Sequence, residues 1–141
     1  MTEKKTPADG ASKPALKIKG STTKKAPEAI DPLKADFRNF LALVWHFLGL
    51  GEPTAIQYDM AHWLQHGPDR LIILGFRGVA KSWITAAYCL WRLYCDPAKE
   101  RLLAVSAGKD KSDEFSTFVL RLIMEMPLLQ HLKPRRDQRQ S

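Results

Sequence analysis

The stretch Leu71–Ser82 constrains the fold of this chain more than any other. It reads L-I-I-L-G-F-R-G-V-A-K-S, which is an apolar run, a turn with two glycines and a helix start. We expect 71–74 to be a strand buried on both faces, because a short apolar run between turn signals suits that position. The turn nearly matches G-x-x-x-x-G-K-[ST], whose backbone N–H groups and lysine contact phosphate oxygens. The pattern predicts a phosphate loop; an ordinary strand-to-helix turn containing a lysine is the alternative.

One position departs from that pattern. Ala80 stands where the second glycine belongs, and alanine in a left-handed backbone conformation costs about 1–2 kcal/mol. The loop keeps Gly75 and Gly78, which supply conformational freedom elsewhere in the turn. We therefore expect the loop to form in spite of Ala80.

Charge and length limit the other possibilities. The 141 residues correspond to one domain or part of one, and no apolar run approaches the ~20 residues that span a bilayer. The net charge of +7 lies at the two ends: residues 1–30 hold seven lysines against three acids, residues 131–141 hold four basic residues against one acid, and residues 31–130 are balanced. We predict a disordered basic leader at 1–30 and a basic tail at 134–141. Such ends bind nucleic acid or only increase solubility, and the sequence leaves both readings open.

The remaining segments alternate between helical and extended patterns. Helices are predicted at 32–48, 54–66, 81–95 and 110–126, and strands at 71–74 and 101–106. This alternation is typical of a parallel sheet with covering helices. The predicted fold class is therefore α/β, with an incomplete P-loop NTPase domain over residues 31–133, because two strands are too few for an independent sheet.

Gln57 has two interpretations. Thr54 and Gln57 fit a capping box, in which the glutamine accepts from the backbone at the start of its own helix. The amide also offers both a donor and an acceptor, which suits the edge of an adenine base. The capping box alone accounts for the residue, so the residues by themselves favour the cap.

Three motifs together resemble one known family. The phosphate-loop stretch, the upstream P-T-x-x-Q-x-D-M-A and the downstream L-L-A-V-S-A-G-K are similar to the N-terminal ATPase region of tailed-phage terminase large subunits. These proteins are the motors that package viral DNA. The similarity is greatest to the short-tailed group whose large subunit is called DNA maturase B, and it covers residues 33 to about 139.

The resemblance implies an ATP and Mg²⁺ site. Lys81 would contact the β- and γ-phosphates, Ser82 would ligate Mg²⁺, and Arg77 would act catalytically by stabilising charge on the transferred phosphate. Gln57 would then sense adenine as well as cap its helix, and Lys109 would lie near DNA. The implied ATP-binding residues are Gln57, Gly75, Phe76, Arg77, Gly78, Val79, Ala80, Lys81 and Ser82.

The resemblance also implies partners, and the sequence departs from it in one respect. Expected partners are double-stranded DNA, the portal, the small terminase subunit and further copies of the chain, in the cytoplasm of an infected or lysogenic bacterium and not at a membrane. However, no apolar strand ending in acidic residues follows Ser106, and the family's nuclease carboxylates are missing. We therefore expect a truncated portion that binds ATP without hydrolysing it alone. The alternatives are a non-catalytic module that binds nucleic acid or a partner, and a helicase-like ATPase.

Overall fold

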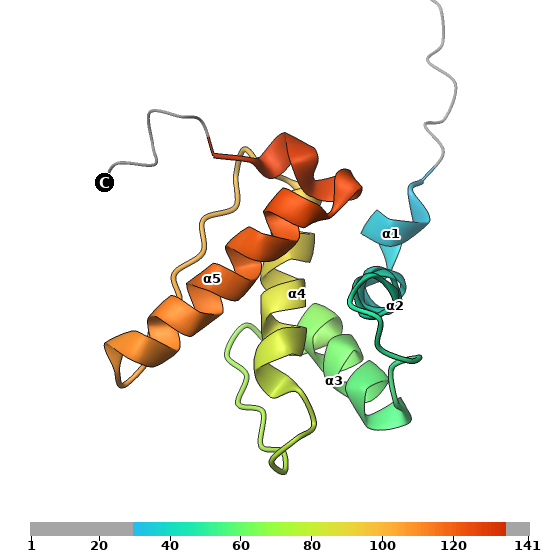
Figure 1. Cartoon of the computed structure of the whole chain (residues 1–141). Coiled ribbons are helices and arrows are strands. Elements are labelled where there is room, and N and C mark those ends of the chain that lie inside the picture. Colours follow the sequence, from blue (N-terminus) through green and yellow to red (C-terminus); the bar gives the residue numbers. More distant parts are fainter. Residues whose placement is uncertain (1–29, 135–141) are drawn as a thin grey trace, which may run out of the picture.

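Helices make up the regular structure of this chain (Figure 1). The computed structural model describes residues 30–134, so all but the last residue of the predicted leader (1–30) and all but the first residue of the predicted basic tail (134–141) lie outside the described residues. The elements in order are α1 (Pro32–Ala35), α2 (Phe37–Phe47), α3 (Ala55–His66), α4 (Lys81–Cys95), α5 (Lys109–Glu125) and the 3₁₀ helix η1 (Pro127–Leu132). No helix in this part of the chain is long and apolar enough to cross a membrane.

Helix α4 is the centre of the fold. It contacts α1, α2, α3, α5 and η1, and Figure 1 shows it between α5 on one side and α2 and α3 on the other. Its buried side chains recur at three- and four-residue spacing, as a helix packed on several sides requires; they are Ile84, Ala86, Ala87, Leu90 and Trp91. The buried positions begin at Ile84, three residues after Lys81, so the core holds α4 from its first turn onward.

The N-terminal helix begins where the sequence predicts but is broken once. Asp31 caps α1 by accepting from the Leu33 N–H at 3.0 Å. The backbone then extends at Asp36 (φ −139°, ψ 119°), and the Asp36 carboxylate caps α2. Gln65 of α3 bridges the break, since its amide accepts from the Phe37 N–H at 2.7 Å and donates to the Ala35 carbonyl at 3.0 Å. The expected single helix over 32–48 is thus wrong at this point.

The predicted parallel sheet is wrong. Residues 71–74 and 101–106 are extended but pair with nothing, and no strand occurs anywhere in 30–134. Ile72 and Leu74 are 86% and 91% exposed, and Leu103 is 88% exposed. A strand needs a neighbour to satisfy its backbone N–H and C=O groups, whereas a helix satisfies its own. The prediction of two strands is wrong because the described residues supply neither a pairing strand nor a second layer that would cover these apolar runs.

The C-terminal helix follows the prediction and then continues differently. Helix α5 buries Leu122 and Ile123 and ends before Pro127. Pro127 does not end the ordered chain, because it opens the 3₁₀ helix η1, in which Leu129 is fully buried. Helix α5 is thereby fixed against α4 at its C-terminal end, and its N-terminal half diverges from α4 (Figure 1).

Candidate functional site

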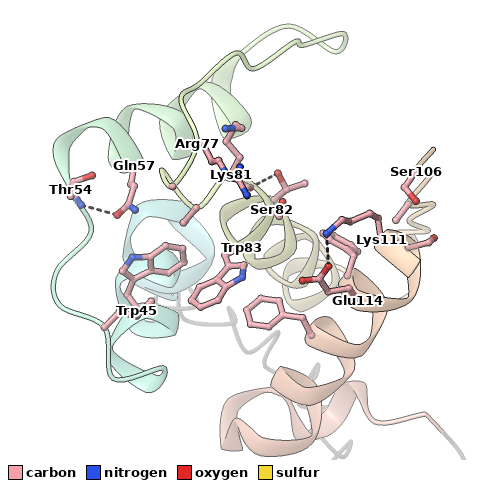
Figure 2. A pocket seen from close by; sticks show the side chains of 18 of the residues that line it. Trp45, Thr54, Gln57, Arg77, Lys81, Ser82, Trp83, Ser106, Lys111 and Glu114 are labelled. Carbon is pink, nitrogen blue, oxygen red and sulfur yellow. Dashed lines mark hydrogen bonds and ion pairs between the residues drawn. The ribbon is translucent and has the colours of Figure 1, made fainter. Parts of the chain in front are cut away.

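A pocket opens at the N-terminus of α4 (Figure 2). Its volume is about 1020 Å³, which is at the upper end of the range for small-molecule sites. Its walls come from the end of α2, the start of α3, the loop before α4, the extended residues 104–106 and the first half of α5. Segments far apart in the sequence therefore meet around the start of one helix.

The backbone before α4 is strained at Ala80. Ala80 is the N-cap of α4 and has φ 67° and ψ 30°, in the left-handed region where L-residues are disfavoured. Gly78 also has a positive φ, of 96°. The methyl side chain of Ala80 cannot accept a hydrogen bond, and the first turn of α4 has no acidic residue. The positive end of the helix dipole and the first N–H groups of α4 thus lie at the pocket without a local anionic partner from that turn.

Lys81 folds back over its own loop. Its ammonium group donates to the carbonyl of Gly75 at 2.8 Å and to the carbonyl of Phe76 at 2.7 Å. The loop is compact here, because a Cβ atom placed on Gly75 would lie 3.3 Å from Val79 Cγ1 and 3.4 Å from Lys81 Cδ. Gly75 thus allows the close approach that holds the lysine at the pocket.

Gln57 connects the start of α3 to the loop. Its Oε1 accepts from the Thr54 N–H at 3.0 Å, which completes the predicted capping box. Its Nε2 donates to the Val79 carbonyl at 3.3 Å, and the Val79 side chain is buried. Both ends of the amide are engaged within the chain, so Gln57 positions the residue next to the strained Ala80.

The structure brings the nine predicted ATP-binding residues into one region. Six of them line the pocket: Gln57, Arg77, Gly78, Ala80, Lys81 and Ser82. Gly75 and Phe76 contribute the carbonyls that hold Lys81, and Val79 contributes the carbonyl that holds Gln57. The catalytic role of Arg77, the Mg²⁺ role of Ser82 and the proximity of Lys109 to DNA remain predictions.

Sequence reasoning missed much of the opposite wall. Trp83 is 41% exposed and stacks on Phe118 of α5, with ring centroids 5.2 Å apart. Lys111 of α5 forms an ion pair with Glu114 at 3.1 Å, and all four residues line the pocket. The available signal was the position of Trp83 directly after Ser82. The α5 residues could not be placed there without knowing how α5 packs on α4.

The pocket suits a phosphate group at the α4 end. An anion is favoured at a helix N-terminus by the dipole and by N–H groups, and Lys81 supplies a positive charge at the same place. The described residues contain no cluster of three or more His, Cys, Asp or Glu side chains that could hold a metal ion. Ser82 has a hydroxyl at the pocket and is the predicted Mg²⁺ ligand.

Comparison with known proteins identifies the relationship. No family model matches the chain. A protein described as "Terminase, large subunit" from Enterobacteria phage T3 is 44% identical to it over 110 residues, which are 77% of this chain and 19% of the T3 protein. The resemblance found in the motifs therefore extends over most of the chain. The chain belongs to the terminase large-subunit family and spans about a fifth of the length of its T3 relative.

Proposed function

We propose that the loop from Gly75 to Ser82 binds the phosphates of Mg²⁺-ATP, and that the chain is the ATP-binding portion of a motor that packages viral DNA. The observation that carries the proposal is the position of Lys81. Lys81 is the first residue of α4 and lines the pocket, and its ammonium group donates to two loop carbonyls. A hydrogen bond from a charged donor to a phosphate oxygen is stronger than one to a neutral carbonyl, so a phosphate competes well for this lysine.

The other loop residues have distinct proposed tasks. The N–H groups at the start of α4 would contact phosphate oxygens, and the Ser82 hydroxyl would contact the Mg²⁺ that accompanies the nucleotide. Arg77, which also lines the pocket, would neutralise charge on the terminal phosphate. Bound Mg²⁺ would supply further charge neutralisation.

Hydrolysis by the chain alone is not part of the proposal. Two carboxylates line the pocket: Glu114, whose Oε2 pairs with Lys111 at 3.1 Å, and Glu52, whose Oε2 accepts from the Tyr58 hydroxyl at 3.2 Å. Neither follows an apolar extended run, which is where the terminase resemblance places the acids that hold Mg²⁺ and orient the attacking water. We therefore expect binding without steady turnover. Double-stranded DNA, a portal, a small terminase subunit and further copies of the chain, in the host cytoplasm, are proposed as partners through the terminase relationship.

Calorimetric titration of the full 141-residue chain with Mg²⁺-ATP tests the proposal. Lys81→Ala should weaken binding by about tenfold or more, because a hydrogen bond involving a charged group contributes roughly 1.5–3 kcal/mol. Lys99→Ala is the matched control, since Lys99 is 85% exposed and pairs with Asp96 at the far end of α4. Equal ATP affinity of the Lys81→Ala and unaltered chains would contradict the proposal.

A DNA-binding measurement tests the alternative function, which is a non-catalytic module that binds nucleic acid. That alternative predicts salt-sensitive DNA binding that survives Lys81→Ala and disappears when residues 1–30 are removed. The proposed function requires ATP binding whatever the result with DNA.

A further inference from the structure

The pocket has an aromatic wall that the phosphate-binding role leaves unused. Trp83 lies on the first turn of α4, and Phe118 of α5 covers one face of its indole at a centroid distance of 5.2 Å and an interplanar angle of 19°. Trp83 is nevertheless 41% exposed and lines the pocket, as Phe118 does. Figure 2 draws Trp83 between Trp45 of α2 and Glu114 of α5. Trp83 therefore presents an exposed part of its side chain at the pocket.

This surface lies at the correct end of the site for the nucleoside. Trp83 is two residues after Lys81, which is roughly 3 Å along the helix axis. A nucleotide whose phosphates contact the start of α4 extends its ribose and base into the rest of the same pocket, and Trp83 lines that pocket. The volume of about 1020 Å³ leaves room beyond the phosphates for both groups.

Gln57 is the polar side chain that could recognise the base, but its amide already makes hydrogen bonds within the chain. Gln57 accepts from the Thr54 N–H and donates to the Val79 carbonyl, so the amide that would pair with an adenine edge is already held by the chain. An aromatic face recognises any base, because every base has a π-surface, and it does not depend on the hydrogen bonds of one base.

We propose that Trp83, supported by Phe118, is the platform on which the base of a purine nucleoside triphosphate stacks. The platform then does not select adenine in particular, and Mg²⁺-GTP binds within a few-fold of Mg²⁺-ATP. This inference rests on the proposed phosphate site and adds the element that holds the rest of the ligand.

The test compares ligands with and without a base on the full-length chain. Trp83→Leu should weaken Mg²⁺-ATP binding by about tenfold, the loss expected for one base stacked on one aromatic side chain. The same variant should bind inorganic tripolyphosphate within twofold of the unaltered chain. Trp83→Phe should retain most of the ATP affinity. Trp63→Leu is the control, because Trp63 is 57% exposed on α3 and is not among the residues that line the pocket.

Fluorescence supplies a second readout that does not depend on a leucine variant folding well. ATP should quench the tryptophan emission of the unaltered chain and tripolyphosphate should not, and Trp83→Phe should remove the quench while ATP still binds. Unchanged ATP affinity in Trp83→Leu, or an equal loss of tripolyphosphate affinity, would overturn the inference. The proposed phosphate site would still stand in either case, because the unaltered chain binds tripolyphosphate. Failure of the unaltered chain to bind either ligand would overturn both.

Discussion

Two regions of the molecule carry similar apolar side chains in opposite environments. The first is the pair of facing surfaces of helices α2 and α4, and the second consists of the extended segments 71–76 and 102–105. Phe37, Phe40 and Leu90 are fully buried, whereas Leu74 is 91% and Val105 83% exposed. The difference follows from backbone hydrogen bonding. A helix satisfies its own backbone and needs only a partner for one face, while an extended segment needs a neighbouring strand before its side chains can be buried. Apolar composition alone therefore does not place a residue in the core.

Truncation of one residue from each region gives the largest expected contrast. Phe37→Ala should lower the free energy of unfolding by about 3–5 kcal/mol, because a buried phenylalanine leaves a cavity, and Phe37 also contacts the rings of Tyr88 and Trp91 at 5.2 and 5.5 Å. Leu74→Ala should change it by less than about 0.5 kcal/mol. Urea unfolding followed by circular dichroism measures both. Similar losses at the two positions would show that segment 71–76 is buried in solution.

Ala80 lies between segment 71–76 and helix α4. Its replacement by glycine should change the free energy of unfolding by less than Phe37→Ala does, and in the opposite direction. Ala80→Gly should stabilise the chain by about 0.5–1 kcal/mol, because glycine avoids most of the strain of φ 67° while the unfolded chain gains some entropy. Ala42→Gly is the control in the interior of α2, and it should destabilise by about 1 kcal/mol. Destabilisation by both substitutions would mean that Ala80 is not strained in solution.

The smallest effect is a pH dependence within the helical region. The Tyr94 hydroxyl donates to the Asp31 carboxylate at 2.6 Å; this hydrogen bond lowers the pKa of Asp31 and raises the pKa of Tyr94 to about 12. The Asp31 contribution is present above its ordinary pKa of 3.8 and is lost as pH falls through the lowered value. The Tyr94 contribution is present below 10.0 and is lost as pH rises toward 12.

Comparison with Tyr94→Phe isolates this pair, because the other titrating groups are common to both chains. The stability difference between the unaltered chain and the variant should be constant between about pH 5 and 9 and should narrow on either side. Chemical unfolding at a series of pH values measures it. A difference that stays constant from pH 3 to 11 would argue against the Asp31–Tyr94 hydrogen bond.

The sequence predicted the helices well because a helix satisfies its own backbone and its start and stop signals are local. Helix starts at Asp31 and Thr54 and the stop at Gly49 are local signals, and all three appear in the structure. Whether a sheet forms could not be predicted from local signals, because pairing of residues 71–74 depends on a neighbouring strand that the local sequence does not specify. The break at Asp36 was missed since it depends on Gln65, which is 29 residues away and bridges the two helices.

One part of the candidate site could be predicted from local sequence, and the other part depends on tertiary packing. Residues from Gly75 to Ser82 are contiguous, so their motif was readable, and the structure places them at one helix start. The wall formed by Phe118, Lys111 and Glu114 comes from α5, and only the packing of α5 against α4 brings it there. Gln57 was assigned to its cap by spacing, but its contact with Val79 across 22 residues required the structure.

Backbone resonances of the ¹⁵N-labelled full chain, followed during titration with Mg²⁺-ATP, test the central claim most directly. The amide signals of residues 75–83 should shift most, because the phosphates are proposed to contact the loop and the first turn of α4 and the base is proposed to contact Trp83. The signals of α1 should remain unchanged, since α1 packs on α4 through Trp91 and Tyr94, near the end of α4 remote from the pocket. Absence of shifts at 75–83 at saturating nucleotide, or shifts confined to other segments, would contradict it.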